Sequence, residues 1–186
     1  GDVYKRQVKP GMMEYQLEAE YIHEFMRHGS RSPAYPSIVG GGANSCILHY
    51  IENTGKLKAG DLVLVDAGCE LEHYASDITR TFPVNGTFSK PQQALYELVL
   101  ASQYAAIEAT HPDNHWNVPH EQVVNILTQG LIDLGLLKGE FNEQVETEGY
   151  RQFFMHRTGH WLGLDVHDVG DYRIQEQWRQ LEPGMA

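Results

Sequence analysis

Two aspartates, Asp66 and Asp77, occupy positions that favour a metal site. Asp66 ends the apolar run 62–66, which predicts a buried strand, and Asp77 lies in the next extended stretch, 73–82. If these two strands form a hairpin, both carboxylates come to the same end of the sheet, where their charges repel unless a cation neutralises them. Oxygen ligands favour Mn²⁺, Mg²⁺ or Ca²⁺, and Zn²⁺ or Co²⁺ become candidates once an imidazole joins. Taken singly, each aspartate could instead cap a turn or pair with Arg80.

Three histidines, His156, His160 and His167, fall close together in a stretch that is interrupted by Gly159 and Gly163. Glycine at such points lets the backbone pass close to a ligand or a facing strand. Each histidine alone would be expected in a core or on the surface. Because the cluster accompanies two strand carboxylates, we interpret it as metal-binding or catalytic.

A second histidine pair, His23 and His28, resembles the zinc motif HExxH but has one residue too many. On a helix of ~3.6 residues per turn this spacing turns the two imidazoles about 140° apart, so they cannot share a metal. We predict a solvated helix surface instead, with Glu24 close to His28 at i, i+4.

The elements that must position these residues follow from the spacing of apolar side chains. A helix is predicted over residues 13–28, ending at Gly29, with glutamates that include Glu14 on its polar face. Its apolar stripe recurs at every fourth position: Met13, Leu17, Tyr21 and Phe25. Short extended segments are expected at 37–39 and 45–50, on either side of a flexible triple-glycine loop.

The second half of the chain predicts two helices followed by strands. Ser89 is placed to cap a helix that runs to about Ala109, and Leu95, Leu98, Val99 and Ser102 continue it at helical spacing. A second helix is expected over 119–134, with Pro119 in its first turn and Gly135 at its end. Strands are expected near 153–156 and 161–166. This order favours an α+β domain in which helices pack on one side of a curved antiparallel sheet.

Composition excludes some partners. The chain has 25 acidic and 14 basic residues, a net charge of -11 and no run of Lys or Arg, so nucleic acid is not expected as a partner. No apolar stretch approaches the ~20 residues that span a bilayer, so no membrane partner is expected either. Cys46 and Cys69 lack the spacing of a disulfide framework or a zinc finger. We predict two buried thiols in a reducing, cytoplasmic setting.

The two ends of the sequence differ in character from the rest. Residues 1–7 resemble a translated sequencing-adapter scar and are set apart as non-native. Residues 8–186 are expected to form part of a larger domain, because Ala186 follows a Glu-Pro-Gly-Met turn with no further element.

Several segments resemble the pita-bread metallopeptidases, and within them the Xaa-Pro aminopeptidases. The resemblance covers nearly everything after residue 7, and its last two segments are the most specific. The segments are Gly11-Met-Met-Glu14, Ile38-Val-Gly-Gly41, Ile47-Leu-His49, Val65-Asp-Ala-Gly68, Ser76-Asp-Ile-Thr-Arg-Thr-Phe82 and the whole of 156–170.

The resemblance implies a site for two divalent metal ions, usually Mn²⁺. Asp66 matches the ligand of one ion, Asp77 the carboxylate that bridges both, and His160 the imidazole on the other ion. Two further glutamate ligands of the family would follow residue 186. Glu182 is not one of them, because it matches a turn that precedes the ligand-bearing Glu-Pro-Gly of the family.

The resemblance also implies roles for His49, His156 and His167, which match positions around the substrate. They would bind the substrate carbonyl or the developing tetrahedral intermediate. For His49, a strand-end histidine bonded to backbone is the competing interpretation.

The implied activity is removal of the N-terminal residue from peptides with proline at position two. A prolidase, which cuts only Xaa-Pro dipeptides, is the alternative within the class, and a methionine aminopeptidase is less similar around 156–170. A pita-bread domain that binds without catalysis is the alternative outside it. The 186-residue chain itself is expected to bind metal weakly and to lack turnover, and the sequence leaves a homo-oligomer open.

Overall fold

The computed structural model describes residues 8–186, so the suggested adapter scar lies outside the described residues. The chain divides into two compact units. The first comprises Gly1–Ser89 with Trp161–Val169, and the second comprises Lys90–His160 with Gly170–Ala186. Each unit has its own hydrophobic core.

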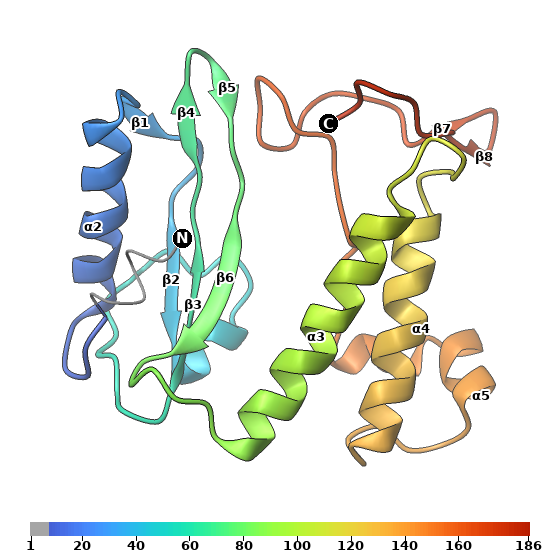
Figure 1. Ribbon diagram of the computed structural model, residues 1–186, viewed down its shortest axis with the longest axis horizontal. Coiled ribbons are helices and arrows are strands. Elements are labelled where there is room, and N and C mark those ends of the chain that lie inside the picture. Colours follow the sequence, from blue (N-terminus) through green and yellow to red (C-terminus); the bar gives the residue numbers. More distant parts are fainter. Residues whose placement is uncertain (1–7) are drawn as a thin grey trace. The chain divides into compact units, whose positions relative to one another are not determined.

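Within residues 8–89 and 161–169, the first unit contains one α-helix, a short 3₁₀ helix and two small antiparallel sheets, drawn in blue to green in Figure 1. The sheet that carries the predicted metal ligand has the order β2-β3-β6, and the other has the order β1-β4-β5. The elements are α2 (Glu14–Arg27), β1 (Ser32–Pro33), β2 (Ile38–Gly41), η1 (Gly42–Cys46), β3 (Leu62–Asp66), β4 (Cys69–Leu71), β5 (Tyr74–Ala75) and β6 (Thr79–Pro83).

The predicted first helix is confirmed as α2, which packs against β2. Leu17 is fully buried in a core that includes Val63 and Val65, and Tyr21 and Phe25 pack against that core. The predicted pair on the helix surface is also present, since His28 Nε2 lies 2.9 Å from Glu24 Oε1. The apolar stripe therefore places α2 as expected.

The expectation that Glu14 lies on the polar face is wrong, because its side chain is only 1% exposed. Its carboxylate accepts hydrogen bonds from Gly41 N (2.8 Å), Asn44 Nδ2 (2.9 Å), Tyr50 Oη (2.8 Å) and Gly55 N (2.6 Å). Burial raises the pKa of Glu14, but these hydrogen bonds outweigh it and hold the pKa below its usual value. One carboxylate thus joins α2, β2, η1 and the loop before β3.

The predicted extended segments are partly confirmed. The run 62–66 is the strand β3, but only Val63 and Val65 are buried while its other residues are partly exposed, so it is not buried on both faces as expected. Residues 45–50 are not extended: η1 ends at Cys46 and a turn follows, in which His49 has a φ of 55°. The stretch 73–82 divides into β5 and β6 with a break over 76–78.

The second unit is mainly helical. Helices α3 and α4, drawn in green and yellow-orange in Figure 1, pack against each other and confirm the two predicted helices. Pro119 lies in the first turn of α4, and Gly135 follows its end with a φ of 72°. Sequence reasoning missed four short elements. The elements of this unit are α3 (Lys90–Ala109), α4 (Val118–Asp133), α5 (Phe141–Glu146), η2 (Gly149–Gln152), β7 (Arg173–Ile174) and β8 (Gln177–Trp178).

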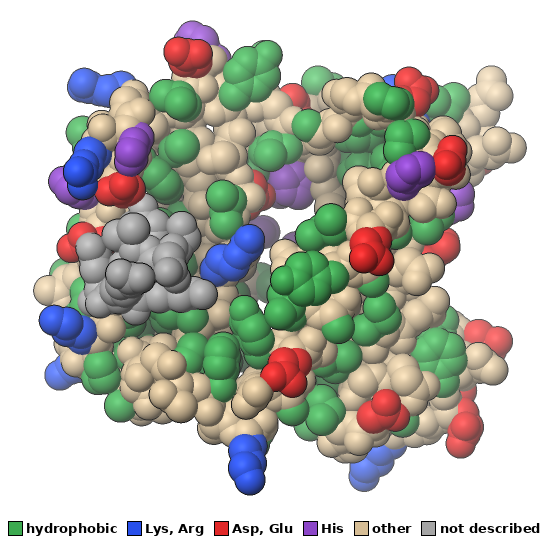
Figure 2. All heavy atoms as spheres, viewed as in Figure 1, with side chains coloured by type: hydrophobic (Ala, Val, Ile, Leu, Met, Phe, Trp, Pro, Cys, Tyr) green, Lys and Arg blue, Asp and Glu red, His purple; other side chains and the backbone are tan. Residues whose placement is uncertain are grey.

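Helix α3 is apolar on more than one side. Leu98 packs into the second unit's core and Ser102 is buried, whereas Val99 and Ile107 are 55% and 60% exposed. Figure 2 shows hydrophobic side chains at the surface of α3. Among residues 8–186, no helix is long and apolar enough to cross a membrane.

The strands predicted near 153–156 and 161–166 are not formed, and both segments are loops. In the second segment the backbone hydrogen bonds are local, since Asp168 N donates to Trp161 O (3.0 Å) and Gly163 N donates to Asp165 O (3.1 Å). A short apolar run does not by itself establish a strand.

Candidate metal centre

Asp66 and Asp77 are brought together by the pairing of β3 with β6, as the predicted hairpin requires. These strands are antiparallel, with Asp66 opposite Thr79, and Ala67 N donates to Ile78 O (3.2 Å). The expectation that Asp77 lies within a strand is wrong, because β5 ends at Ala75 and β6 begins at Thr79. Asp77 therefore lies in the break, where the backbone is not held by a regular ladder.

Gly68 allows the chain after Asp66 to pass the chain before Asp77. A Cβ atom on Gly68 would overlap the carbonyl oxygen of Ser76, so a larger residue does not fit without backbone movement. The same crossing is tied by Ser76 Oγ, which accepts a hydrogen bond from Cys69 N (2.9 Å) and donates one to Cys69 O (3.0 Å). The close approach at Gly68 thus keeps the two carboxylate-bearing segments together.

Tyr35 joins the two carboxylates and was missed by sequence reasoning. Its hydroxyl lies 2.5 Å from Asp66 Oδ1 and 3.0 Å from Asp77 Oδ1. The phenol is placed by β1, which pairs with β4, and by Ala34 N donating to Gly68 O (2.9 Å). Tyr35 lies far from both aspartates in the sequence, so only the strand pairing reveals it.

The electrostatics of this cluster differ from those of an isolated carboxylate. Burial raises the pKa of Asp66, the hydrogen bond from Tyr35 opposes this, and the negative charge of Asp77 raises it further, with a net increase. Burial and the two carboxylates also raise the pKa of the Tyr35 hydroxyl, which therefore remains a hydrogen-bond donor. The protein holds two like charges close together at a cost that a bound cation would relieve.

His156 and His160 lie in a loop of the second unit. The loop is tethered to the first turns of α4: Arg157 Nη2 donates to Asn117 Oδ1, and Thr158 Oγ1 lies 2.8 Å from His120 Nδ1. His156 is exposed and His160 is partly buried. Gly159, expected to permit a close approach, has room around it, since a Cβ there would meet no heavy atom within 4 Å.

His49 and His167 belong to the first unit, and both are exposed. His49 lies in the turn after η1, so the strand-end interpretation of this residue is wrong. His167 lies in the loop 161–169, which is joined to β5 by Ala75 N donating to Gly163 O (2.8 Å). A Cβ at Gly163 would overlap the carboxylate of Asp168, so a larger residue here would require that side chain to move.

The structure therefore brings together Asp66, Asp77 and the additional residue Tyr35. Among residues 8–186 it forms no group of three or more His, Cys, Asp or Glu side chains that could hold a metal ion. Asp66 and Asp77 lie in the first unit and His160 in the second, so their predicted convergence stays a prediction. The donors that are present, two carboxylate oxygens sharing one phenol, fit a hard divalent cation.

The cysteines and the turn at Glu182 were also predicted from the sequence. The cysteines are free thiols, but the prediction that they are buried is wrong, because Cys46 is exposed and Cys69 is partly exposed. The turn expected at Glu182 is present, with Met185 N donating to Glu182 O (3.3 Å). Its carboxylate is not needed to explain the site.

The family model for metallopeptidase family M24 matches residues 2–186, and the chain belongs to this family. The Xaa-Pro aminopeptidase of Haemophilus influenzae is 57% identical over 178 residues, which are 96% of this chain and 41% of that relative. This chain thus spans about two fifths of the length of such relatives.

Solved structures agree with this assignment. Aminopeptidase PepP of Pseudomonas aeruginosa is 55% identical with a TM-score of 0.97, and the match covers 98% of this chain and 41% of that chain. A zinc-substituted Escherichia coli aminopeptidase P in complex with product is 51% identical with a TM-score of 0.94, covering 98% and 41% respectively. The expected pita-bread fold is confirmed, and the chain covers part of it.

Proposed function

We propose that this chain is part of the catalytic domain of an Xaa-Pro aminopeptidase, which hydrolyses the bond before a proline at position two of a peptide. The observation that carries the proposal is the pair of carboxylates, Asp66 and Asp77, on one tyrosine hydroxyl. Membership of the M24 family and relatives named Xaa-Pro aminopeptidase support it.

We propose two divalent metal ions, with Mn²⁺ as the physiological metal. Asp66 and Asp77 would hold them together with His160 and with two glutamates supplied by chain beyond residue 186. When bound, such ions supply Lewis acidity that polarises a peptide carbonyl and lowers the pKa of water.

The chain's own residues would orient the ligands and the substrate. The Tyr35 hydroxyl, which has one proton to donate, lies within hydrogen-bond distance of Oδ1 of both aspartates and so would orient the two carboxylates. His49, His156 and His167 would donate hydrogen bonds to the substrate carbonyl oxygen as it gains negative charge. The tethers from α4 to Arg157 and Thr158 restrict the loop that carries His156.

The proposal is tested on the full-length gene product and on the 186-residue chain in parallel. Asp77→Asn should abolish hydrolysis of Xaa-Pro peptides by the full-length protein and lower its Mn²⁺ affinity at least tenfold in calorimetry. Asp113→Asn is the matched control, because Asp113 has a side chain that is 90% exposed and lies outside the cluster. The 186-residue chain should bind Mn²⁺ weakly and show no turnover.

The outcomes separate the alternatives. Cleavage of tripeptides and longer substrates supports an aminopeptidase, whereas cleavage confined to Xaa-Pro dipeptides identifies a prolidase. If the full-length protein binds Mn²⁺ tightly but hydrolyses no Xaa-Pro peptide, the protein is a non-catalytic binding module. Turnover by the 186-residue chain would refute the role given to the additional glutamates.

Location and assembly are also proposals. The free thiols of Cys46 and Cys69 support a reducing, cytoplasmic compartment. A peptide is the proposed partner. A homo-oligomer is the proposed assembly, and static light scattering of the full-length protein would test it.

A further inference from the structure

The turn that carries His49 adopts an unusual backbone conformation. His49 has a φ of 55°, and Asn53, four residues later, has a φ of 48°. Residues other than glycine rarely adopt this left-handed conformation, so contacts around the turn must hold it. The apolar side chains of the turn contribute little to this, because Ile47, Leu48 and Ile51 are each more than half exposed.

Tyr50, the residue after His49, is held by the buried carboxylate of Glu14. Tyr50 is 7% exposed, and its hydroxyl donates to Glu14 Oε2 (2.8 Å) and accepts from Asn44 Nδ2 (3.0 Å). Asn44 Nδ2 also donates to Glu14 Oε1 (2.9 Å). At the start of the turn, Ile47 N donates to Asn44 O (3.1 Å). The chain on both sides of His49 is therefore joined to one carboxylate.

Asn53 holds the end of the same segment. It is 2% exposed, and its Oδ1 accepts from Val39 N (2.9 Å) in β2. Its Nδ2 donates to Ser37 O (2.9 Å) and to Glu18 Oε2 (2.8 Å). Figure 1 shows that α2, which carries Glu14 and Glu18, lies beside β2. The segment with His49 is thus attached to both of these elements.

The hydrogen bonds of Glu14 specify one arrangement of its partners. Burial raises the pKa of Glu14, but its hydrogen bonds outweigh burial and hold the pKa below its usual value, so the group is ionised at neutral pH. Apolar side chains of similar volume often stabilise a fold as well as a buried charge does. A buried charge with directed hydrogen bonds instead restricts the conformation of the groups that it binds. Here those groups include the neighbour of His49.

We propose that Tyr50 is a positioning residue for His49, an inference that rests on the proposed function. Through its hydroxyl, Tyr50 holds the left-handed backbone of His49 in place, so that the imidazole meets the substrate carbonyl from one fixed position. Because Tyr50 is buried and its hydroxyl binds Glu14 and Asn44, it acts through His49 and not on the substrate. All four residues belong to the first unit.

A double-mutant cycle in the full-length, Mn²⁺-loaded protein tests this role. Tyr50→Phe removes the hydroxyl but keeps the ring, and it should lower kcat/KM for an Xaa-Pro tripeptide about tenfold. In a His49→Ala background the same substitution should lower kcat/KM less than about twofold, because the residue on which Tyr50 acts is absent. The loss of Tm caused by Tyr50→Phe should be the same in both backgrounds.

Two further variants complete the cycle. Tyr15→Phe is the matched control, because Tyr15 is the neighbour of Glu14 on α2 and is 51% exposed, and it should leave kcat/KM unchanged. Asn44→Ala removes the amide that orients the Tyr50 hydroxyl and should lower kcat/KM roughly three- to fivefold, again only where His49 is present. If Tyr50→Phe and Asn44→Ala lower kcat/KM equally with and without His49, Tyr50 has a structural role alone and the proposal is overturned.

The backbone of His49 provides a second measurement that needs neither metal nor hydrolysis. In the metal-free 186-residue chain, Tyr50→Phe should lower the ¹H–¹⁵N NOE of the His49 amide or broaden its resonance, whereas Tyr15→Phe should not. An unchanged His49 amide in Tyr50→Phe would overturn the positioning role. If the unsubstituted full-length protein cleaves no Xaa-Pro peptide, the proposed function fails, and this NMR comparison still decides whether Tyr50 holds His49.

Discussion

Two groups of carboxylates in the first unit are held in opposite ways. Glu14 is almost completely buried and accepts hydrogen bonds from four groups of the protein, and its pKa is lowered. Asp66 and Asp77 are partly buried, share the hydroxyl of Tyr35, and face each other, and the pKa of Asp66 is raised.

The difference teaches how to distinguish a structural carboxylate from one prepared for a ligand. Where the fold supplies enough donors to balance the negative charge, the ionised group stabilises the fold. Where the fold places a second negative charge beside the first, the ionised pair destabilises the fold and favours binding of a cation. The first condition describes Glu14 and the second describes Asp66 with Asp77.

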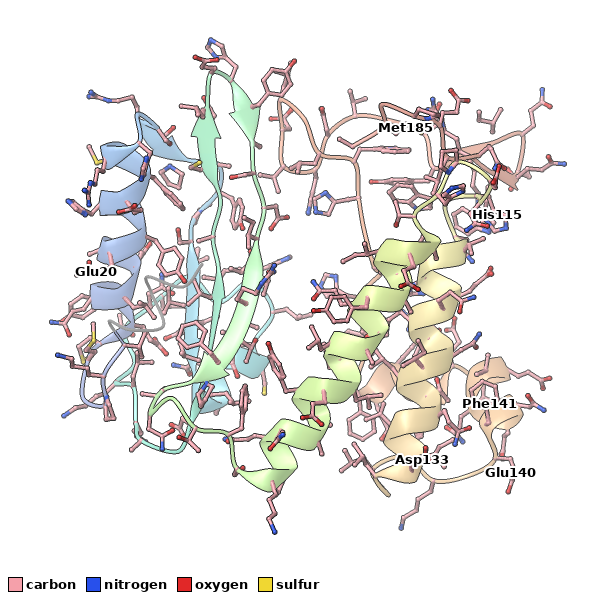
Figure 3. The ribbon with its side chains drawn as sticks, in the orientation of Figure 1. Glu20, His115, Asp133, Glu140, Phe141 and Met185 are labelled. Atoms are coloured by element: carbon pink, nitrogen blue, oxygen red, sulfur yellow. The ribbon has the colours of Figure 1, made fainter. Side chains whose placement is uncertain are left out.

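Removing the Glu14 carboxylate should have the largest effect. Glu14→Ala leaves the buried donors of Gly41, Asn44 and Gly55 without their acceptor and should lower the free energy of unfolding by about 3 kcal/mol. Urea denaturation of the chain measures this. Glu20→Ala, on the same helix and labelled in Figure 3, is the control and should change stability by less than about 0.5 kcal/mol. Equal effects of the two substitutions would show that the Glu14 carboxylate does not stabilise the fold more than an ordinary surface glutamate.

The close approach at Gly68 should come next. Gly68→Ala places a Cβ against the carbonyl of Ser76, so the segments that carry Asp66 and Asp77 must separate. We expect a loss of about 2 kcal/mol in urea denaturation and weaker Mn²⁺ binding in calorimetry. Gly60→Ala is the control: its φ of 89° adds backbone strain that Gly68 does not have, but a Cβ there would meet nothing within 4 Å, so Mn²⁺ affinity should not change. Unchanged Mn²⁺ affinity in Gly68→Ala would show that the crossing does not position the aspartates.

The sequence predicted those parts of the fold whose signal is local. The stripe of Leu17, Tyr21 and Phe25 predicted α2, and the apolar run ending at Asp66 predicted β3 with its bounds, because burial of one face determines each element. Asp77 was correctly expected near Asp66 because β3 pairs with β6, although it lies in the break before β6 rather than within a strand.

The parts that could not be predicted depend on contacts between distant segments. Tyr35 reaches the aspartates only through the pairing of β1 with β4, and Glu14 is buried only because a loop near Gly55 folds over α2. The predicted strand at 161–166 failed because its backbone hydrogen bonds are local rather than part of a ladder. The periodicity of apolar residues indicates which side chains face a core, but it does not indicate which segments the backbone hydrogen-bonds to.

Removing one charge of the aspartate pair should have a smaller effect of opposite sign. Asp77→Asn keeps an oxygen that can accept from Tyr35 but removes the repulsion on Asp66, so the metal-free chain should gain about 0.5–1 kcal/mol of stability at neutral pH. The same substitution should weaken Mn²⁺ binding. Urea denaturation with a chelator present measures the gain, with Asp113→Asn as the unchanged control. A loss of stability would mean that the pair is structural, like Glu14.

The dependence of these stabilities on pH gives the smallest and sharpest contrast. Because the pKa of Glu14 is lowered on folding, its contribution is present above its unfolded value of 4.5 and is lost as pH falls through the folded pKa. Because the pKa of Asp66 is raised, Asp66 takes up a proton at a higher pH in the folded chain than in the unfolded chain. Acidification from the raised pKa toward 3.8 therefore relieves the repulsion between the two aspartates and favours folding. The deficit of Glu14→Gln and the gain of Asp77→Asn, measured by urea denaturation in metal-free buffers, should therefore both shrink toward zero with acidification. If the differences in stability between each variant and the unsubstituted chain stay constant over these pH ranges, neither effect arises from the ionised carboxylates.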